Sequence, residues 1–280
     1  MENQNNPLKS YFRKPGIWVK LPSQGQFYTV KPKDLNEQGE IPVFPMTAKD
    51  ELLLKNADAL LNGSAIVELI QSCAPTISDP SNMPSVDLDA VLLAIRRCTY
   101  GETMDIATMH DCKENAKNEV SLNLNAVISS IKVVDIIEPA TLSNSIKVYI
   151  KPITVKQLLD LNWVQYEQIR NLQLAEQNEV DEKTKVDLLQ KSYQTLTNQN
   201  IKIVSECIDS VLLPDGVSVN NAANIKEWAT DLSKQDFKLI ETAIMELGNK
   251  GVEKTFKVQC QHCNQEYDSQ LDLNPTSFFE

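Results

Sequence analysis

Apolar and polar residues recur with helical spacing between Val43 and Gly101, and the rest of the chain is organised around this stretch. Thr47 followed three residues later by Asp50 is a helix-start pattern, because the hydroxyl accepts a free backbone N–H and the acid lies at the positive helix end. The apolar spacing predicts three helices, over residues 47–63, 64–74 and 86–100. The stretch therefore predicts a compact helical unit.

Upstream of these helices, short apolar runs predict three strands, over residues 17–21, 27–30 and 41–44. The segment LPSQGQFY places turn residues between the first two runs, so we expect a β-hairpin there. Residues 1–16 contain two prolines and few apolar residues, which predicts a flexible N-terminal arm. We expect the arm to bind a neighbouring subunit through Tyr11 and Phe12, so that its deletion spares monomer folding but hinders assembly.

The second half of the chain repeats the opening pattern in a weaker form. Pro152 to Lys156 presents the same order of residue types as Pro45 to Lys49, and a predicted strand precedes the motif both times. Between the two motifs we expect a strand or short helix over residues 126–137 and a strand over 146–150. Five helices are predicted to follow, over residues 155–178, 183–197, 200–213, 222–231 and 234–247.

Each half also contains a polar knuckle between two alternating segments, over about residues 103–125 and 255–274. The shared order of strand, helices and knuckle indicates an internal duplication, with a chance match of five residues as the alternative. The predicted fold class is α+β, mostly helical with short β-hairpins. The predicted organisation is the arm, a first unit with one knuckle and a diverged second unit with extra helices and a CxxC knuckle, at residues 1–16, 17–125 and 126–280.

Composition limits the class of protein. A chain of 280 residues with 42% hydrophobic and 23% charged residues can bury a core in one large or two ordinary domains. The sequence has neither a bilayer-spanning apolar run nor a signal-peptide pattern, so we expect a cytoplasmic protein with reduced thiols. Three of the cysteines lie on apolar helix faces and are predicted to be buried, namely Cys73, Cys98 and Cys207.

Charge and motifs limit its function. A net charge of −11 disfavours binding to nucleic-acid phosphates and favours protein partners. The sequence carries no G-x-S-x-G, no H-E-x-x-H and no phosphate-cradling glycine-rich loop. We therefore do not expect an enzyme.

Cys260-Gln-His-Cys263 gives the strongest chemical signal, because two thiolates separated by two residues in a turn can bind one zinc ion. A structural zinc needs four ligands, and the other knuckle carries His110 and Cys112. We therefore predict a single structural zinc site formed by His110, Cys112, Cys260 and Cys263. The alternatives are a metal-free relic of a zinc knuckle and a site completed by His262 or by a partner protein. A redox C-x-x-C is disfavoured, since the βαβ context of such motifs does not follow.

Several segments resemble one known protein family. LPSQGQFY, VFPMTAKDELLLKNADALLNG, IVELIQSCAP and LDAVLLAIRRCTYGE are similar to the baseplate hub protein family of T-even-type contractile-tailed bacteriophages. The resemblance covers about residues 17–125, and PMTAKDE followed by DALLNG is its most specific part. In that family a knuckle with paired cysteines usually follows the CTYGE-like segment, whereas this chain has MHDC.

The resemblance implies a structural component or assembly factor of the central hub of a phage tail baseplate. Its partners would be other hub or tail proteins, without nucleic acid or membrane, and the chain would be a possible oligomer within the assembly. Its location would be the host cytoplasm during assembly and the virion tail baseplate afterwards. One alternative is a transient hub assembly chaperone that is absent from the mature virion. A more distant one, resting on CQHC alone, is a zinc-ribbon nucleic-acid-binding protein.

Overall fold

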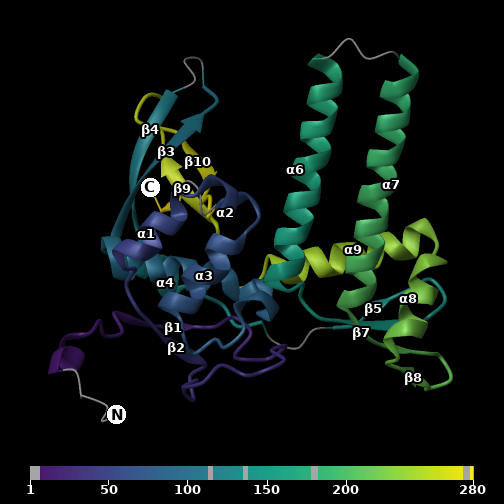
Figure 1. Cartoon of the computed structure of the whole chain (residues 1–280), viewed down its shortest axis with the longest axis horizontal. Coiled ribbons are helices and arrows are strands. Elements are labelled where there is room, and N and C mark those ends of the chain that lie inside the picture. The colour runs from purple at the N-terminus through teal and green to yellow at the C-terminus, as the bar shows by residue number, and fades with distance from the viewer. Residues whose placement is uncertain (1–6, 113–115, 135–137, 178–181, 274–277, 280) are drawn as a thin grey trace, which may run out of the picture.

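The computed structural model describes residues 7–112, 116–134, 138–177, 182–273 and 278–279. It has two lobes (Figure 1): one holds the short helices and the hairpins of both chain ends, and the other holds two long helices above a small sheet. Helices and short antiparallel strands are mixed along the chain, so the predicted α+β class is confirmed. The internal duplication and the unit boundaries stay predictions.

The first lobe is built from the N-terminal half of the chain and from its C-terminal hairpin. Its elements are η1 (Pro7–Tyr11), β1 (Ile17–Lys20), β2 (Glu40–Val43), α1 (Ala48–Leu54), α2 (Ala57–Leu61), α3 (Ser64–Cys73), η2 (Pro80–Asn82), η3 (Ser85–Asp87), α4 (Leu88–Tyr100), β3 (Thr103–His110), β4 (Ala116–Asn123), α5 (Leu124–Ser129), β9 (Thr255–Gln259) and β10 (Glu266–Gln270).

The second lobe is built from the segment between these two parts. Its elements are β5 (Ala140–Thr141), β6 (Lys147–Ile150), α6 (Val155–Gln177), α7 (Glu182–Cys207), β7 (Ile208–Leu212), β8 (Ser218–Val219), α8 (Ala222–Thr230) and α9 (Lys234–Gly248). The four strands form one antiparallel sheet in the order β5-β6-β7-β8.

Side-chain capping determines where the first helices begin and end. Thr47 caps α1 as predicted, because its hydroxyl accepts a bond from the Asp50 N–H while the Asp50 carboxylate accepts from the Thr47 N–H. The prediction of a single helix over residues 47–63 is wrong. Lys55 ends α1, and the Asn56 side chain then accepts bonds from the next backbone N–H groups and caps α2.

The predicted hairpin over LPSQGQFY is also wrong, since β1 pairs antiparallel with β2 and residues 27–30 form no strand. The backbone turns at Phe27, which has a φ of 65°, outside the extended region that a strand requires. Ser23 and Tyr28 donate hydrogen bonds to the carboxylate of Asp87, just before α4. A tertiary contact therefore shapes this segment.

The second half contains two further departures from the predicted elements. The helices predicted over residues 183–197 and 200–213 are one helix, α7, followed by strand β7. Ile208 and Val211 of β7 are buried. The segment forms a strand because its backbone pairs antiparallel with that of β6. The run over residues 126–137 begins within the short helix α5, while residues 135–137 lie outside the described part. Both predicted knuckles are antiparallel hairpins, β3–β4 and β9–β10.

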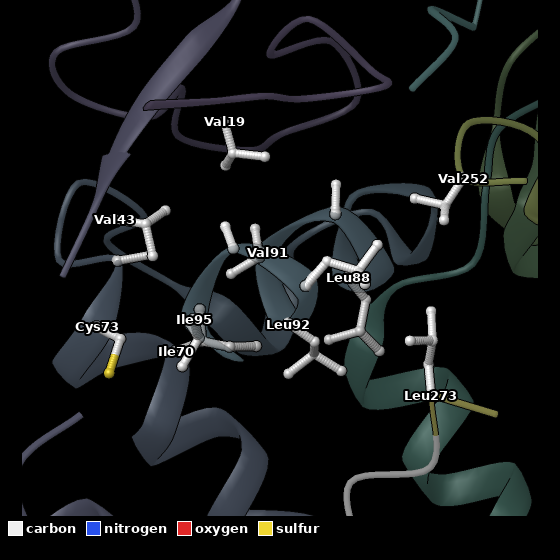
Figure 2. Packing of buried hydrophobic residues seen from close by; sticks show 14 of the residues in the cluster. Val19, Val43, Ile70, Cys73, Leu88, Val91, Leu92, Ile95, Val252 and Leu273 are labelled. Carbon is white, nitrogen blue, oxygen red and sulfur yellow. The ribbon is translucent and has the colours of Figure 1, made fainter. Parts of the chain in front are cut away.

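The core of the first lobe surrounds α4 and joins distant parts of the chain. Figure 2 shows the α4 side chains between residues of β1, β2 and α3 on one side and residues from the end of the chain on the other. The labelled members are Val19, Val43, Ile70, Cys73, Leu88, Val91, Leu92, Ile95, Val252 and Leu273. The second core draws almost wholly on residues between Val134 and Leu247. The chain thus leaves the first lobe, builds the second and returns.

Candidate metal centre

The tips of the two hairpins lie against each other through a small set of polar contacts. The Thr108 Oγ1 and Tyr267 hydroxyl oxygens are 2.5 Å apart, and the Asn118 side-chain amide donates to the same tyrosine hydroxyl at 3.1 Å. The ring of His110 stacks on that of Tyr267, with centroids 4.4 Å apart and planes inclined by 15°. Thr108 and His110 share one face of β3, because alternate strand residues point the same way. The hairpins therefore meet through their inward faces.

Each hairpin contributes a pair of potential metal ligands from its tip. His110 ends β3, and the Cys112 N–H donates to the His110 carbonyl at 2.9 Å, which turns the second side chain toward the first. In the other hairpin, Cys260 follows β9 and Cys263 lies in the tight turn before β10. The turn is closed by the Asn264 N–H donating to the Cys260 carbonyl at 2.9 Å, with Asn264 in the left-handed region at φ 57°.

The structure brings the four predicted ligand residues together. The ligand atoms of His110, Cys112, Cys260 and Cys263 all lie within 4.8 Å of one another, and Cys263 Sγ is 3.4 Å from His110 Nδ1. In a tetrahedral site with zinc–sulfur bonds of about 2.3 Å, neighbouring sulfurs are about 3.8 Å apart. A donor set of three thiols and one imidazole at this spacing fits zinc, and His262 lies outside the group.

The backbone of the CxxC turn favours a thiolate. The pKa of Cys260 is lowered from 9.0 to about 6, chiefly because the Cys263 N–H donates to its sulfur, with a further contribution from the His262 N–H. The pKa of Cys263 is raised: the Gln265 N–H lowers it, but burial and the nearby sulfurs of Cys260 and Cys112 together raise it more. Crowded thiols oppose each other's ionisation, and a bound cation removes that opposition.

The remaining cysteines behave differently. Cys73 and Cys207 are buried, as predicted, while Cys98 is half-buried. Burial raises the pKa of Cys73 to about 11 and that of Cys207 to about 12, so both stay protonated at neutral pH. These thiols are parts of the two hydrophobic cores.

Asn118 is a supporting residue that the sequence patterns did not reveal. Its side chain is 1% exposed, its Oδ1 accepts from the Gln261 N–H at 2.9 Å, and its Nδ2 lies 3.8 Å from Cys260 Sγ. It thus holds the CxxC turn against β4 and contacts the sulfur of a potential metal ligand. An asparagine inside a strand is unfavourable, which is the one sequence signal that marks this position.

Comparison with known proteins places the chain in a family. Neither curated proteins nor solved structures gave a significant match. Among the described residues, no helix combines the length and apolar character needed to cross a bilayer. The model of the T4 bacteriophage base plate protein family matches residues 15–280, which agrees with the resemblance seen in the first half of the sequence. Because this match covers nearly the whole chain, the protein belongs to the T4 bacteriophage base plate protein family, a family of structural baseplate proteins and not of enzymes.

Proposed function

We propose that the protein acts in the central hub of the baseplate, as a structural component or as an assembly factor. Membership in the family supports a role in the baseplate. The likeness of LPSQGQFY and PMTAKDE to hub proteins supports a location in the hub. Both segments have structural tasks: Ser23 and Tyr28 of the first bind Asp87, and Thr47 and Asp50 of the second cap α1. Both segments with this likeness therefore belong to the first lobe.

Quantitative mass spectrometry of purified virions tests the hub role. A hub subunit is present at a fixed ratio to the other baseplate proteins after extensive washing. A transient assembly chaperone is absent from virions but co-purifies with hub proteins from infected cells before particles form. A protein found neither in virions nor with hub intermediates has no hub role, which would refute the proposal.

We further propose that His110, Cys112, Cys260 and Cys263 hold one structural zinc ion. The ion would supply the positive charge that lets the crowded thiols ionise together. The support is the spacing of the four ligand atoms, together with the backbone donors to Cys260 and the buried amide of Asn118.

The proposed site would act as a structural clip. Cys112 and Cys260 are 148 positions apart in the sequence, and the whole second lobe lies between them. Closing so long a loop is entropically costly, and a metal that binds only the folded chain stabilises it by mass action. The zinc would therefore hold the returning hairpin β9–β10 on the first lobe.

Elemental analysis of the purified chain tests the clip. We expect one zinc per chain, with zinc content and thermal stability both lowered by Cys263→Ser. The matched control is Cys207→Ser, since that thiol is buried in the second core and should leave zinc content unchanged. His262→Ala should also retain zinc. Loss of zinc in His262→Ala, or retention in Cys263→Ser, would exclude this ligand set.

A further inference from the structure

We propose that Cys260 and Cys263 are a redox-sensitive pair, which a low-molecular-weight disulfide such as glutathione disulfide converts into a disulfide within the CxxC turn. The inference rests on the proposed zinc site, because the pair supplies two of the four proposed ligands. It adds regulation to that site: the oxidised turn no longer holds the ion, and the clip between the two hairpins opens. The pair differs from a catalytic redox motif, since the exchange changes only this chain.

The two thiols of the pair differ in their access to solvent. Cys263 is exposed, whereas Cys260 is 0% exposed. Thiol–disulfide exchange begins where the reagent can reach a sulfur, so a molecule as bulky as glutathione disulfide reacts first with Cys263. The mixed disulfide formed in this way lies beside a second thiol that the reagent itself does not reach.

Cys260 is the neighbouring thiol best placed to complete the exchange. The potential ligand atoms of the cluster all lie within 4.8 Å of one another, and the side chains of Cys260 and Cys263 are close enough to hydrogen-bond. Both belong to one tight turn, so their sulfurs can join without movement between the hairpins. The attacking sulfur approaches opposite the leaving glutathione, which lies on the solvent side, and this geometry also favours the covered thiol. Cys112 belongs to the other hairpin and would have to move with it.

The exchange takes place in two steps. The Cys263 thiolate attacks one sulfur of glutathione disulfide, the bond between the two glutathione sulfurs breaks, and one glutathione leaves as a thiolate. The Cys260 thiolate then attacks the Cys263 sulfur, and the second glutathione leaves. The two cysteines lose two electrons, and glutathione disulfide gains them in becoming two glutathiones. The leaving thiolates take up as many protons as the two cysteines lost on ionisation.

The disulfide removes half of the proposed donor set. The thiolate is the form of cysteine that binds metal, so only His110 and Cys112 remain as ligands in the oxidised cluster. A structural zinc site needs four ligands, and two do not hold the ion. Oxidation therefore also removes the stabilisation that zinc gives the folded chain by mass action.

Other contacts keep the oxidised hairpins in place. The hairpins β3–β4 and β9–β10 lie side by side (Figure 1), and the Tyr267 hydroxyl contacts Thr108 Oγ1 at 2.5 Å and the Asn118 amide at 3.1 Å. Leu271, just after β10, is buried in the core around α4. These contacts do not use the sulfurs of the pair, so oxidation loosens the hairpin tips without unfolding the first lobe.

The surroundings of a phage protein change in the direction that this pair can sense. The host cytoplasm keeps thiols reduced, whereas the surface of a virion outside the cell is in an oxidising environment. A hub subunit is made in the first environment and carried into the second when virions leave the cell. The clip is then closed during assembly and open afterwards.

Glutathione disulfide added to the folded, reduced, full-length chain tests the proposal. Elemental analysis before the addition measures zinc content, and peptide mass spectrometry after it identifies the disulfide. We expect a disulfide between Cys260 and Cys263, the release of about one zinc for each disulfide, and reversal of both by dithiothreitol with added zinc. The buried thiols of Cys73 and Cys207 should stay unmodified, which shows that the chain reacted while folded.

Three cysteine variants separate the roles of the thiols. Cys260→Ser should stop after the first step and carry one glutathione on Cys263, whereas Cys112→Ser should still form the disulfide. Cys207→Ser is the matched control and should react as the wild type does, since that thiol lies in the second core. A wild-type disulfide between Cys112 and Cys263 would overturn the proposal. A Cys260→Ser chain without glutathione on Cys263, or reaction of the buried thiols together with the pair, would overturn it too.

The zinc site and the redox pair can fail separately in this experiment. A chain that contains zinc, keeps it in a large excess of glutathione disulfide and forms no disulfide contradicts the redox pair and leaves the zinc site standing. A chain purified without zinc that takes up none when zinc is added refutes the zinc site. In that case the presence or absence of the disulfide between Cys260 and Cys263 alone decides whether the two thiols are a redox pair.

Discussion

Asp87 is a buried carboxylate whose titration should make the protein more stable as the pH falls, opposite to the usual effect of acid. Its side chain is 0% exposed and accepts three hydrogen bonds, from Ser23 N at 2.8 Å, Ser23 Oγ at 2.5 Å and the Tyr28 hydroxyl at 2.8 Å. Burial raises its pKa from 3.8 to about 6, because desolvation of the charged form outweighs the stabilisation that these bonds give the carboxylate.

The sign follows from proton linkage. Between about pH 4 and about pH 6, the folded chain binds a proton at Asp87 that the unfolded chain does not bind, so the free energy of unfolding rises as the pH falls. This contribution is complete below the unfolded-state pKa near 3.8 and is lost as the pH rises through about 6. A difference of about two pKa units corresponds to about 3 kcal/mol in full, of which about 2 kcal/mol appears between about pH 7.5 and about pH 4.5.

Chemical denaturation of the wild type and of Asp87→Asn at both pH values isolates this effect. The asparagine cannot titrate, and the constant cost of its altered hydrogen bonds cancels when each protein is compared with itself. We expect the stability of the wild type, relative to the variant, to rise by about 2 kcal/mol at the lower pH. A relative change near zero, or a loss of stability, would refute the reasoning.

Three further substitutions test contacts that join distant segments. Asn118→Ala should lower the free energy of unfolding by about 1–3 kcal/mol and weaken zinc binding about 10- to 100-fold in chelator competition; unchanged affinity would exclude its supporting role. Gly63→Ala should lower the free energy of unfolding by about 1–3 kcal/mol, because Gly63 has a φ of 76° and a Cβ there would lie 2.6 Å from Leu159 Cδ1. An unchanged midpoint in denaturant titration would contradict this. Arg96→Met should lower the free energy of unfolding by about 1–3 kcal/mol and speed proteolysis of the C-terminal segment. The reason is that Arg96 donates to the Phe278 carbonyl and its guanidinium lies 5.3 Å from the Phe278 ring. Protease resistance equal to that of the wild type would argue against this contact.

Local signals in the sequence predicted local structure well. The pair Thr47 and Asp50 marks the start of α1, where the hydroxyl accepts a bond from the N–H three residues on. The helix predicted to end at residue 100 does end there, at the C-cap Gly101, because glycine tolerates the positive φ of 105° found at that position. Caps of this kind depend on a few neighbouring residues, so the sequence alone suffices.

Departures from the prediction arose where distant contacts decide. The LPSQGQFY segment has the composition of a hairpin turn, but its conformation depends on Asp87, about 60 positions away. Strand β7 likewise depends on pairing with β6. The break at Asn56 is different, because its cap is local and the apolar spacing used to predict one helix did not take it into account. For the candidate metal centre, residue type and knuckle position identified the four residues whose potential ligand atoms the structure brings together. Asn118 and Tyr267 could not be found in this way, because their role exists only once two separate hairpins pack together.

X-ray absorption at the zinc edge of the purified full-length chain tests the shared metal site most directly. If both hairpins bind one ion, the first coordination shell contains three sulfurs at about 2.3 Å and one nitrogen at about 2.0–2.1 Å, and His110→Ala removes the nitrogen contribution. A shell dominated by oxygen, a shell with two sulfurs from the CxxC turn alone, or a nitrogen signal that persists in His110→Ala would contradict the account.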